Sequence, residues 1–198
     1  MLGLPKQSEI KKIITKNELF DFLDDQNIYL NKQEFNDDIK RITLVNQIRK
    51  QNDLGQFLII YVVLISLKRM DFNEKSITML YKLLGKTTIF ILEYEEISKL
   101  AILYGKIFVS EWKNTDEQYI KLDGVTFNDV WENIVIQIGN FKVKEGRTLS
   151  EQIEFDDKRR RILMEIEQLD NMVRKEKQPN KKFYIAKKIN KLREELED

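Results

Sequence analysis

One short stretch of the chain carries residue types found at metal-dependent nuclease sites. Such sites place an acid and a Glu-x-Lys sequence on adjacent strands, so that carboxylates bind Mg²⁺ and the lysine orients the attacking water. Here the apolar run 57–68 ends in the sequence ISLK, with Lys68 in a suitable place but Ser66 where the acid should be. The nearby acids are Asp53, Asp71, Glu93 and Glu95. Because acids in turns are usually ordinary surface, we expect no catalytic residues, and an active or degenerate nuclease is the alternative.

The amino-acid composition excludes several other chemistries. The chain has no Cys, so it has neither a disulfide nor a thiolate nucleophile. It also has no His, so a Cys/His zinc site and an imidazole acid or base are excluded. Its 34 basic and 33 acidic residues nearly cancel to a formal charge of +1, so bulk charge predicts no polyanionic partner. We expect no metal and no cofactor, and any binding argument must rest on a local cluster.

The strongest local cluster of charge lies at residues 174–188. Seven basic residues stand there against the single acid Glu176, and two aromatic residues interleave with them. Such a cluster can contact phosphates and stack on bases, or present a docking surface to a protein. Alternatively, the lysines only solvate a protruding turn while Phe183 packs across it. The candidate binding residues are Arg174, Lys175, Lys177, Lys181, Lys182, Phe183, Tyr184, Lys187 and Lys188.

Two apolar stripes flank this basic cluster. Each stripe steps by threes and fours, which places its members on one narrow face of a helix, as in the seam of a coiled coil. The stripes are Ile162, Ile166, Leu169 and Val173, then Ile185, Ile189, Leu192 and Leu196. Pro179 lies between them and cannot continue a helix interior. The pattern predicts an antiparallel helical hairpin.

The remainder of the chain predicts an α+β body with a mostly antiparallel sheet of five to six strands packed on helices. Residues 1–15 have few structural signals and are interpreted as a surface arm. We expect helices at 17–23 (capped by Asn17), 31–40 (capped by Asn31), 73–84 and 126–138. We expect strands at 42–46, 57–68, 87–94, 99–104 and 107–112, with a short edge strand at 119–122.

These elements fall into two predicted domains. The α+β body with its arm covers residues 1–145 and the hairpin covers residues 146–198, with Gly146 in the linker. Trp112, Phe127, Trp131 and Phe141 are expected to pack in the core between the last helix of the body and the sheet. The longest apolar run, 57–67, is well short of the roughly 20 residues that span a bilayer, and the first residues do not resemble a signal peptide. We therefore expect a cytoplasmic protein without membrane contact.

Several sequence pieces along the chain resemble one protein family. They are LGLP at residues 2–5, the strand ending in LK at 67–68, TTIFILEY at 87–94, SEW at 110–112, VWENI at 130–134 and RKEKQPNKKF at 174–183. Together they resemble the bacterial domain of unknown function numbered four-three-nine-one over nearly the whole chain. The resemblance provides no catalytic residues. It implies an accessory subunit encoded beside helicases, DNA methyltransferases and restriction-type subunits of anti-phage defence clusters.

The expected function is therefore that of a non-enzymatic adaptor. The body would dock onto a helicase-type or restriction-type protein subunit, while the basic hairpin would contact DNA, RNA or a second protein. A homo-oligomer assembled through the hairpin seam is a further alternative. Each stripe covers about three heptads, so its helix needs a partner helix to be stable.

Overall fold

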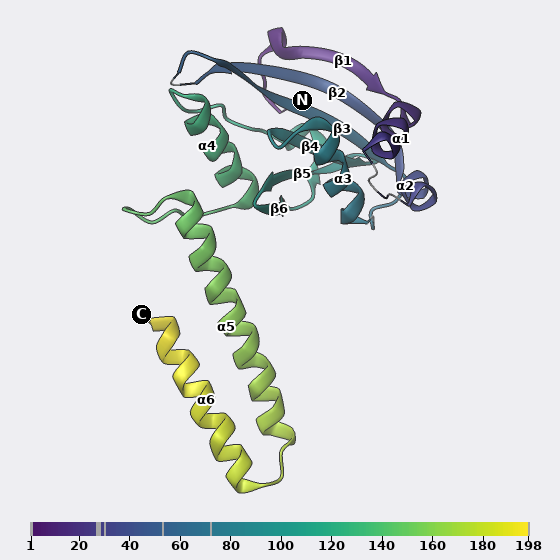
Figure 1. Ribbon diagram of the computed structural model, residues 1–198. Coiled ribbons are helices and arrows are strands. Elements are labelled where there is room, and N and C mark those ends of the chain that lie inside the picture. Colours follow the sequence, from purple (N-terminus) through teal and green to yellow (C-terminus); the bar gives the residue numbers. More distant parts are fainter. Residues whose placement is uncertain (1, 27–28, 30, 53, 72, 198) are drawn as a thin grey trace. The chain divides into compact units, whose positions relative to one another are not determined.

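The computed structural model describes residues 2–26, 29, 31–52, 54–71 and 73–197, with the side chains of residues 74 and 197 left out. The chain divides into two compact units, residues 1–140 and 141–198. The predicted linker glycine, Gly146, lies in the second unit with a positive φ of 84°. Each unit has its own secondary structure (Figure 1).

A mixed sheet forms the centre of the first unit. Its main path follows the chain order, and all neighbours are antiparallel except β3 and β4, which are parallel and joined by the helix α3. The strands are β1 (Glu9–Ile14), β2 (Ile39–Gln51), β3 (Phe57–Leu67), β4 (Thr88–Tyr94), β5 (Ile97–Tyr104), β6 (Lys106–Val109) and β7 (Lys113–Asn114), which pairs with β5. The prediction of a mostly antiparallel sheet is confirmed.

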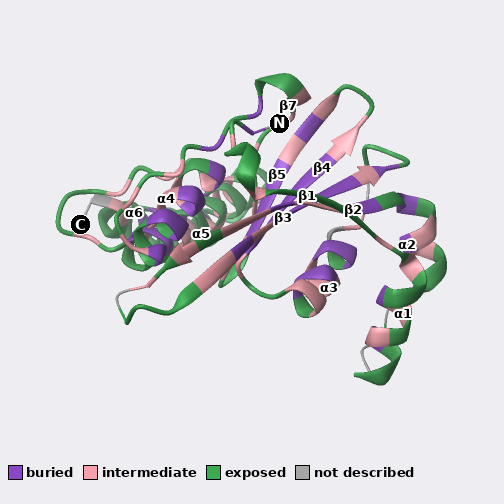
Figure 2. Ribbon diagram, turned by 90° about the horizontal axis from the view of Figure 1, so that it is seen from above, coloured by how far each residue is buried: buried purple, intermediate pink, exposed green. Residues whose placement is uncertain are grey.

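Helices cover both faces of this sheet. They are α1 (Lys16–Asp25), α2 (Lys32–Asp38), α3 (Glu74–Leu84) and α4 (Phe127–Gly139), with short 3₁₀ turns at Lys6–Ser8 and Thr115–Glu117. Figure 2 shows α3 and α4 on opposite sides of the sheet. Successive side chains of β3 point to opposite faces of the sheet. Val63 and Ile65 join the core cluster on one face, Val62 and Leu64 point to the other face, and all four are buried. The run 57–67 is therefore one strand, which is buried on both faces at residues 62–65 and exposed where it begins at Phe57.

The main core cluster joins the sheet to the first three helices. This buried cluster includes Leu19 and Leu23 of α1, Phe35 of α2, Leu80 of α3 and Phe90 of β4. These side chains are at most 1% exposed. The helical spacing of α2 and α3 thus places Phe35 and Leu80 in the core. The helix expected at 31–40 ends at Asp38, because Ile39 begins β2.

Three expectations for the first unit are wrong. Residues 9–14, interpreted as part of a surface arm, form the edge strand β1 on β2, and its nearly uniform exposure explains why no apolar alternation marked it. The cap of α1 is Thr15, not Asn17, because Thr15 and Glu18 form a reciprocal capping box. No strand forms at 119–122, where Tyr119 makes only an isolated bridge to Leu2.

The second unit contains the predicted helical hairpin. Helix α5 (Leu149–Lys175) begins with a capping box between Thr148 and Glu151, and α6 (Pro179–Glu197) lies beside it (Figure 1). All eight residues of the two predicted stripes pack together in one cluster. Pro179 is the first residue of α6, a position where its missing N–H costs nothing. The hairpin and its seam are confirmed.

Candidate nucleic-acid interface

The turn between α5 and α6 is built around the side chain of Glu176. Glu176 caps the end of α5, and its Oε1 accepts hydrogen bonds from the backbone N–H groups of Lys177 and Gln178, each at 2.8 Å. The Lys182 N–H donates to the Gln178 carbonyl at 3.0 Å and closes the first turn of α6. The single acid of the basic cluster is therefore a structural part of the turn.

The electrostatic state of Glu176 follows from these contacts. The hydrogen bond from the Gln178 N–H, followed by that from Lys177 and the positive charges of Lys181 and Lys182, lowers the pKa of the Glu176 carboxyl. Glu176 is therefore ionised at neutral pH, and both backbone hydrogen bonds of its carboxylate lie within its own turn.

All nine candidate binding residues are exposed on this hairpin tip, which we define as residues 174–188. Phe183 and Tyr184 are 70% and 75% exposed, so the alternative that Phe183 packs across the hairpin is wrong. Lys188 pairs with Glu165 of α5 at 2.6 Å. Among the described residues no ion pair joins an acid to Arg174, Lys175, Lys177, Lys181, Lys182 or Lys187.

The residues considered for a nuclease site do not all line one cavity. Ser66 and Glu93 lie opposite each other on the parallel pair β3 and β4, with Ser66 Oγ 3.4 Å from Glu93 Oε2. Together with Lys40, Arg41, Leu67 and Glu95 they line a cavity of about 480 Å³. Lys68 is not part of that lining, because its Nζ donates to the Asn36 carbonyl at 2.6 Å.

The acids around this cavity do not gather into a metal site. Asp71 is exposed in the loop after β3, and Asp53 lies outside the described residues. Within the described part of the chain no three acidic residues lie close enough together to hold a metal ion. Sequence analysis did not identify Asp38 as a notable residue. Its side chain is fully buried and forms an ion pair with Arg69.

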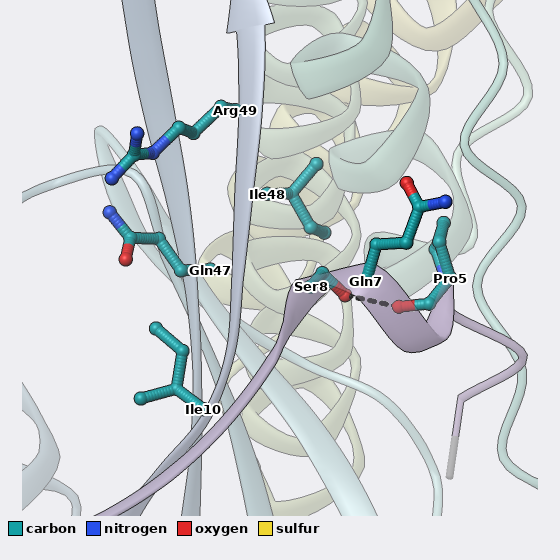
Figure 3. Close-up of a pocket in the computed structure, with 7 residues that line it drawn as sticks. All are labelled: Pro5, Gln7, Ser8, Ile10, Gln47, Ile48 and Arg49. Atoms are coloured by element: carbon teal, nitrogen blue, oxygen red, sulfur yellow. Dashed lines mark hydrogen bonds between the residues drawn. The ribbon is translucent and has the colours of Figure 1, made fainter.

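A second hollow lies beside the edge strand β1. Its lining comes from the turn 5–8, from β1 and from β2, and its volume is about 450 Å³ (Figure 3). The Ser8 hydroxyl donates to the Pro5 carbonyl at 2.7 Å, and Arg49 is the only charged residue in the lining. Such a set provides neither an acid–base pair nor a nucleophile with its base.

The aromatic residues that sequence analysis assigned to one core do not share a single packing group. Phe127 and Trp131 are buried on α4, and α4 contacts β5 and β6. Trp112 packs instead against the cluster formed by the first three helices, and Phe141 belongs to the second unit. Core packing is confirmed for the two residues of α4 only.

The chain combines a mixed α/β unit with a helical hairpin that has a basic tip. A model of the family described as Domain of unknown function (DUF4391) matches residues 2–196. The chain belongs to that family. No curated protein and no solved structure gives a significant match. No helix in the described part of the chain is both long and apolar enough to cross a membrane.

Proposed function

We propose that this protein is a non-enzymatic accessory module that contacts nucleic acid through its hairpin tip. The carrying observation is that the basic and aromatic side chains of residues 174–188 are all exposed, while the only acid among them is occupied by its own turn. Exposed lysine and arginine bind phosphates regardless of base sequence. The tip therefore supports affinity for a polyanion without sequence specificity.

The distribution of charge along the chain favours this function over simple solvation of the turn. Seven basic residues against one acid give the tip a formal charge of +6, so the rest of the chain carries −5. An anionic strand is attracted to the tip and repelled by the remainder. Field asymmetry of this kind accelerates and orients the encounter with a charged ligand.

The hairpin seam favours a binding module over a self-assembly module. All eight seam residues already pack within one chain. The exposed apolar residues Leu163, Met164 and Met172 of α5 do not repeat at the spacing of a second stripe. Nothing in this pattern offers a second copy of the hairpin a complementary seam.

The body is assigned the docking role in this proposal. The family resemblance supports a larger helicase-type or restriction-type partner from an anti-phage defence system. The use of Lys68 as a hydrogen-bond donor to Asn36 supports a non-enzymatic role over a nuclease. Ser66 in place of an acid supports the same conclusion.

Charge reversal at the tip tests the proposed contact. Binding of fluorescently labelled oligonucleotides to the full chain would be measured by anisotropy over a series of salt concentrations. The double variant Lys181→Glu, Lys182→Glu should weaken binding roughly tenfold or more for every base sequence, since two phosphate contacts become repulsive. It should also flatten the log–log salt dependence by roughly one to two units.

The matched control reverses two exposed lysines of the first unit, Lys86 and Lys113, and makes the same change in net charge. It should leave both affinity and salt dependence nearly unchanged. Oligonucleotide incubated with the protein and Mg²⁺ should keep its full length. Equal losses of affinity in the two double variants, or no affinity of the native chain even at low salt, would contradict binding of nucleic acid by the tip.

A further inference from the structure

We infer that the exposed flank of α6 beside its seam is a track for single-stranded nucleic acid, with Tyr184 as the platform on which a base stacks. The inference rests on the proposed function and names its ligand class. It adds residues beyond the tip, namely Lys191 on the track and Glu165 as a residue that weakens it.

A hollow runs along the side of α6 that begins at the tip. Its volume is about 690 Å³, and every residue that lines it belongs to α6. The lining consists of Tyr184, Lys187, Lys188, Asn190, Lys191 and Glu194. Because one helix provides the whole lining, the hollow is shallow and open to solvent. Three lysines and one exposed aromatic ring are the combination that single-strand binding surfaces use.

The spacing of these residues makes the hollow continuous with the tip. Lys181, Tyr184, Lys188 and Lys191 follow one another by three, four and three positions, which places them on one face of the helix. The seam residues Ile185, Ile189 and Leu192 lie beside this row and are turned toward α5, so the track runs along the flank of α6 next to the seam. From Lys181 to Lys191 the track rises by about 15 Å, which suits a short oligonucleotide segment.

Tyr184 decides between a single strand and a duplex. Its side chain is 75% exposed, although a ring of this size gains free energy when it is covered. Base faces are available for stacking only where bases are unpaired, while the bases of a duplex already stack on each other. A duplex would therefore use the lysines and leave the ring unused.

Acidic residues limit the track. Glu165 of α5 holds Lys188 in an ion pair of 2.6 Å, which competes with a phosphate for the same ammonium group. Glu194 closes the far end of the hollow and repels the phosphate chain there. Glu165 is thus a positioning residue that lowers affinity, and its removal should increase it.

The first arm of the test removes the ring. Tyr184→Ala in the full chain should weaken binding of a single-stranded oligonucleotide by roughly 5- to 150-fold, the range of one stacked base. The affinity of the same variant for a double-stranded oligonucleotide of equal charge should fall less than twofold. Tyr119→Ala removes a tyrosine that is 64% exposed in the first unit, and it should change neither ligand's affinity.

The second arm removes the competing carboxylate. Glu165→Gln frees Lys188 and should tighten single-strand binding about two- to threefold with a steeper salt dependence. Asp170→Asn is its matched control. It makes the same charge change on α5, but its partner Arg193, 3.8 Å away, does not line the hollow. This control should leave the affinity within error.

The outcomes separate the two proposals. A stronger preference for duplex, or a Tyr184→Ala variant that binds single strands as the native chain does, overturns the track even if reversal of Lys181 and Lys182 still abolishes binding. If Glu165→Gln and Asp170→Asn raise the single-strand affinity equally, Glu165 acts only through its bulk charge. That result would also overturn the track. Absence of any oligonucleotide binding refutes the proposed function itself.

Discussion

At the scale of single residues, Asp38 is a buried carboxylate that the proposed function does not use. Asp38 at the end of α2 is fully buried, with Arg69 as its ionic partner. The Asn73 N–H, at the cap of α3, donates to its other oxygen at 2.9 Å. One side chain thus connects the end of α2 to the start of α3 and the loop after β3.

This arrangement predicts an asymmetry between its two partners. Arg69→Ala should lower the free energy of unfolding by about 3–5 kcal/mol, because it leaves a buried carboxylate without a cation. Asp38→Asn keeps the size and one acceptor while removing the charge, and should cost about 1–2 kcal/mol. Urea unfolding followed by circular dichroism would measure both. The reverse order would mean that the Arg69 guanidinium, whose side chain is 55% exposed, contributes little to the stability of Asp38.

At the scale of elements, the hairpin depends on its seam for stability. Its surface ion pairs are expected to contribute only about 0–1 kcal/mol each. Ile189 is 4% exposed at the centre of the seam. Ile189→Ala should therefore lower the free energy of unfolding of the hairpin by about 2–4 kcal/mol.

The control for this substitution is Leu163→Ala, which truncates an α5 side chain that is 48% exposed and lies outside the seam. Its cost should stay within about 0.5 kcal/mol. Thermal melts of the full chain, read by far-ultraviolet circular dichroism, would compare the two variants. Equal costs would mean that the seam does not hold the two helices together.

Sequence analysis succeeded for elements that carry a strong periodic pattern and failed for those that do not. The seam of the hairpin was predicted residue by residue because both stripes have helical spacing, and β3 because its apolar run is long. The strand β1 was missed because most of its residues are exposed and because a bulge, with Lys11 at a φ of 59°, interrupts its alignment with β2. Its partner lies some 30 residues away, and local sequence does not encode that pairing.

The candidate site shows the same division. The basic tip was predictable from the density of charge alone. The continuation along α6 was not recognised, although Tyr184, Lys188 and Lys191 stand at helical spacing. The pair between Glu165 and Lys188 depends on how the two helices align, and only the structure provides that alignment. Likewise, the engagement of Lys68 by Asn36 could not be read from a strand pattern.

At the scale of the whole molecule, the chain separates a sheet-containing unit from a charged hairpin. The near-zero net charge conceals a tip of +6 on a chain that otherwise carries −5. This separation predicts that nucleic acid contacts one short segment and leaves the sheet-containing unit untouched.

The most direct test is photochemical crosslinking of a bound single-stranded oligonucleotide to the full chain, followed by mass spectrometry of the modified peptides. We expect crosslinks within residues 174–191, with Tyr184 prominent among them, and loss of those crosslinks in the Lys181→Glu, Lys182→Glu variant. Tyr119, an exposed tyrosine of the first unit, serves as the internal reference and should remain unmodified. Crosslinks concentrated within residues 1–140 would contradict the central claim.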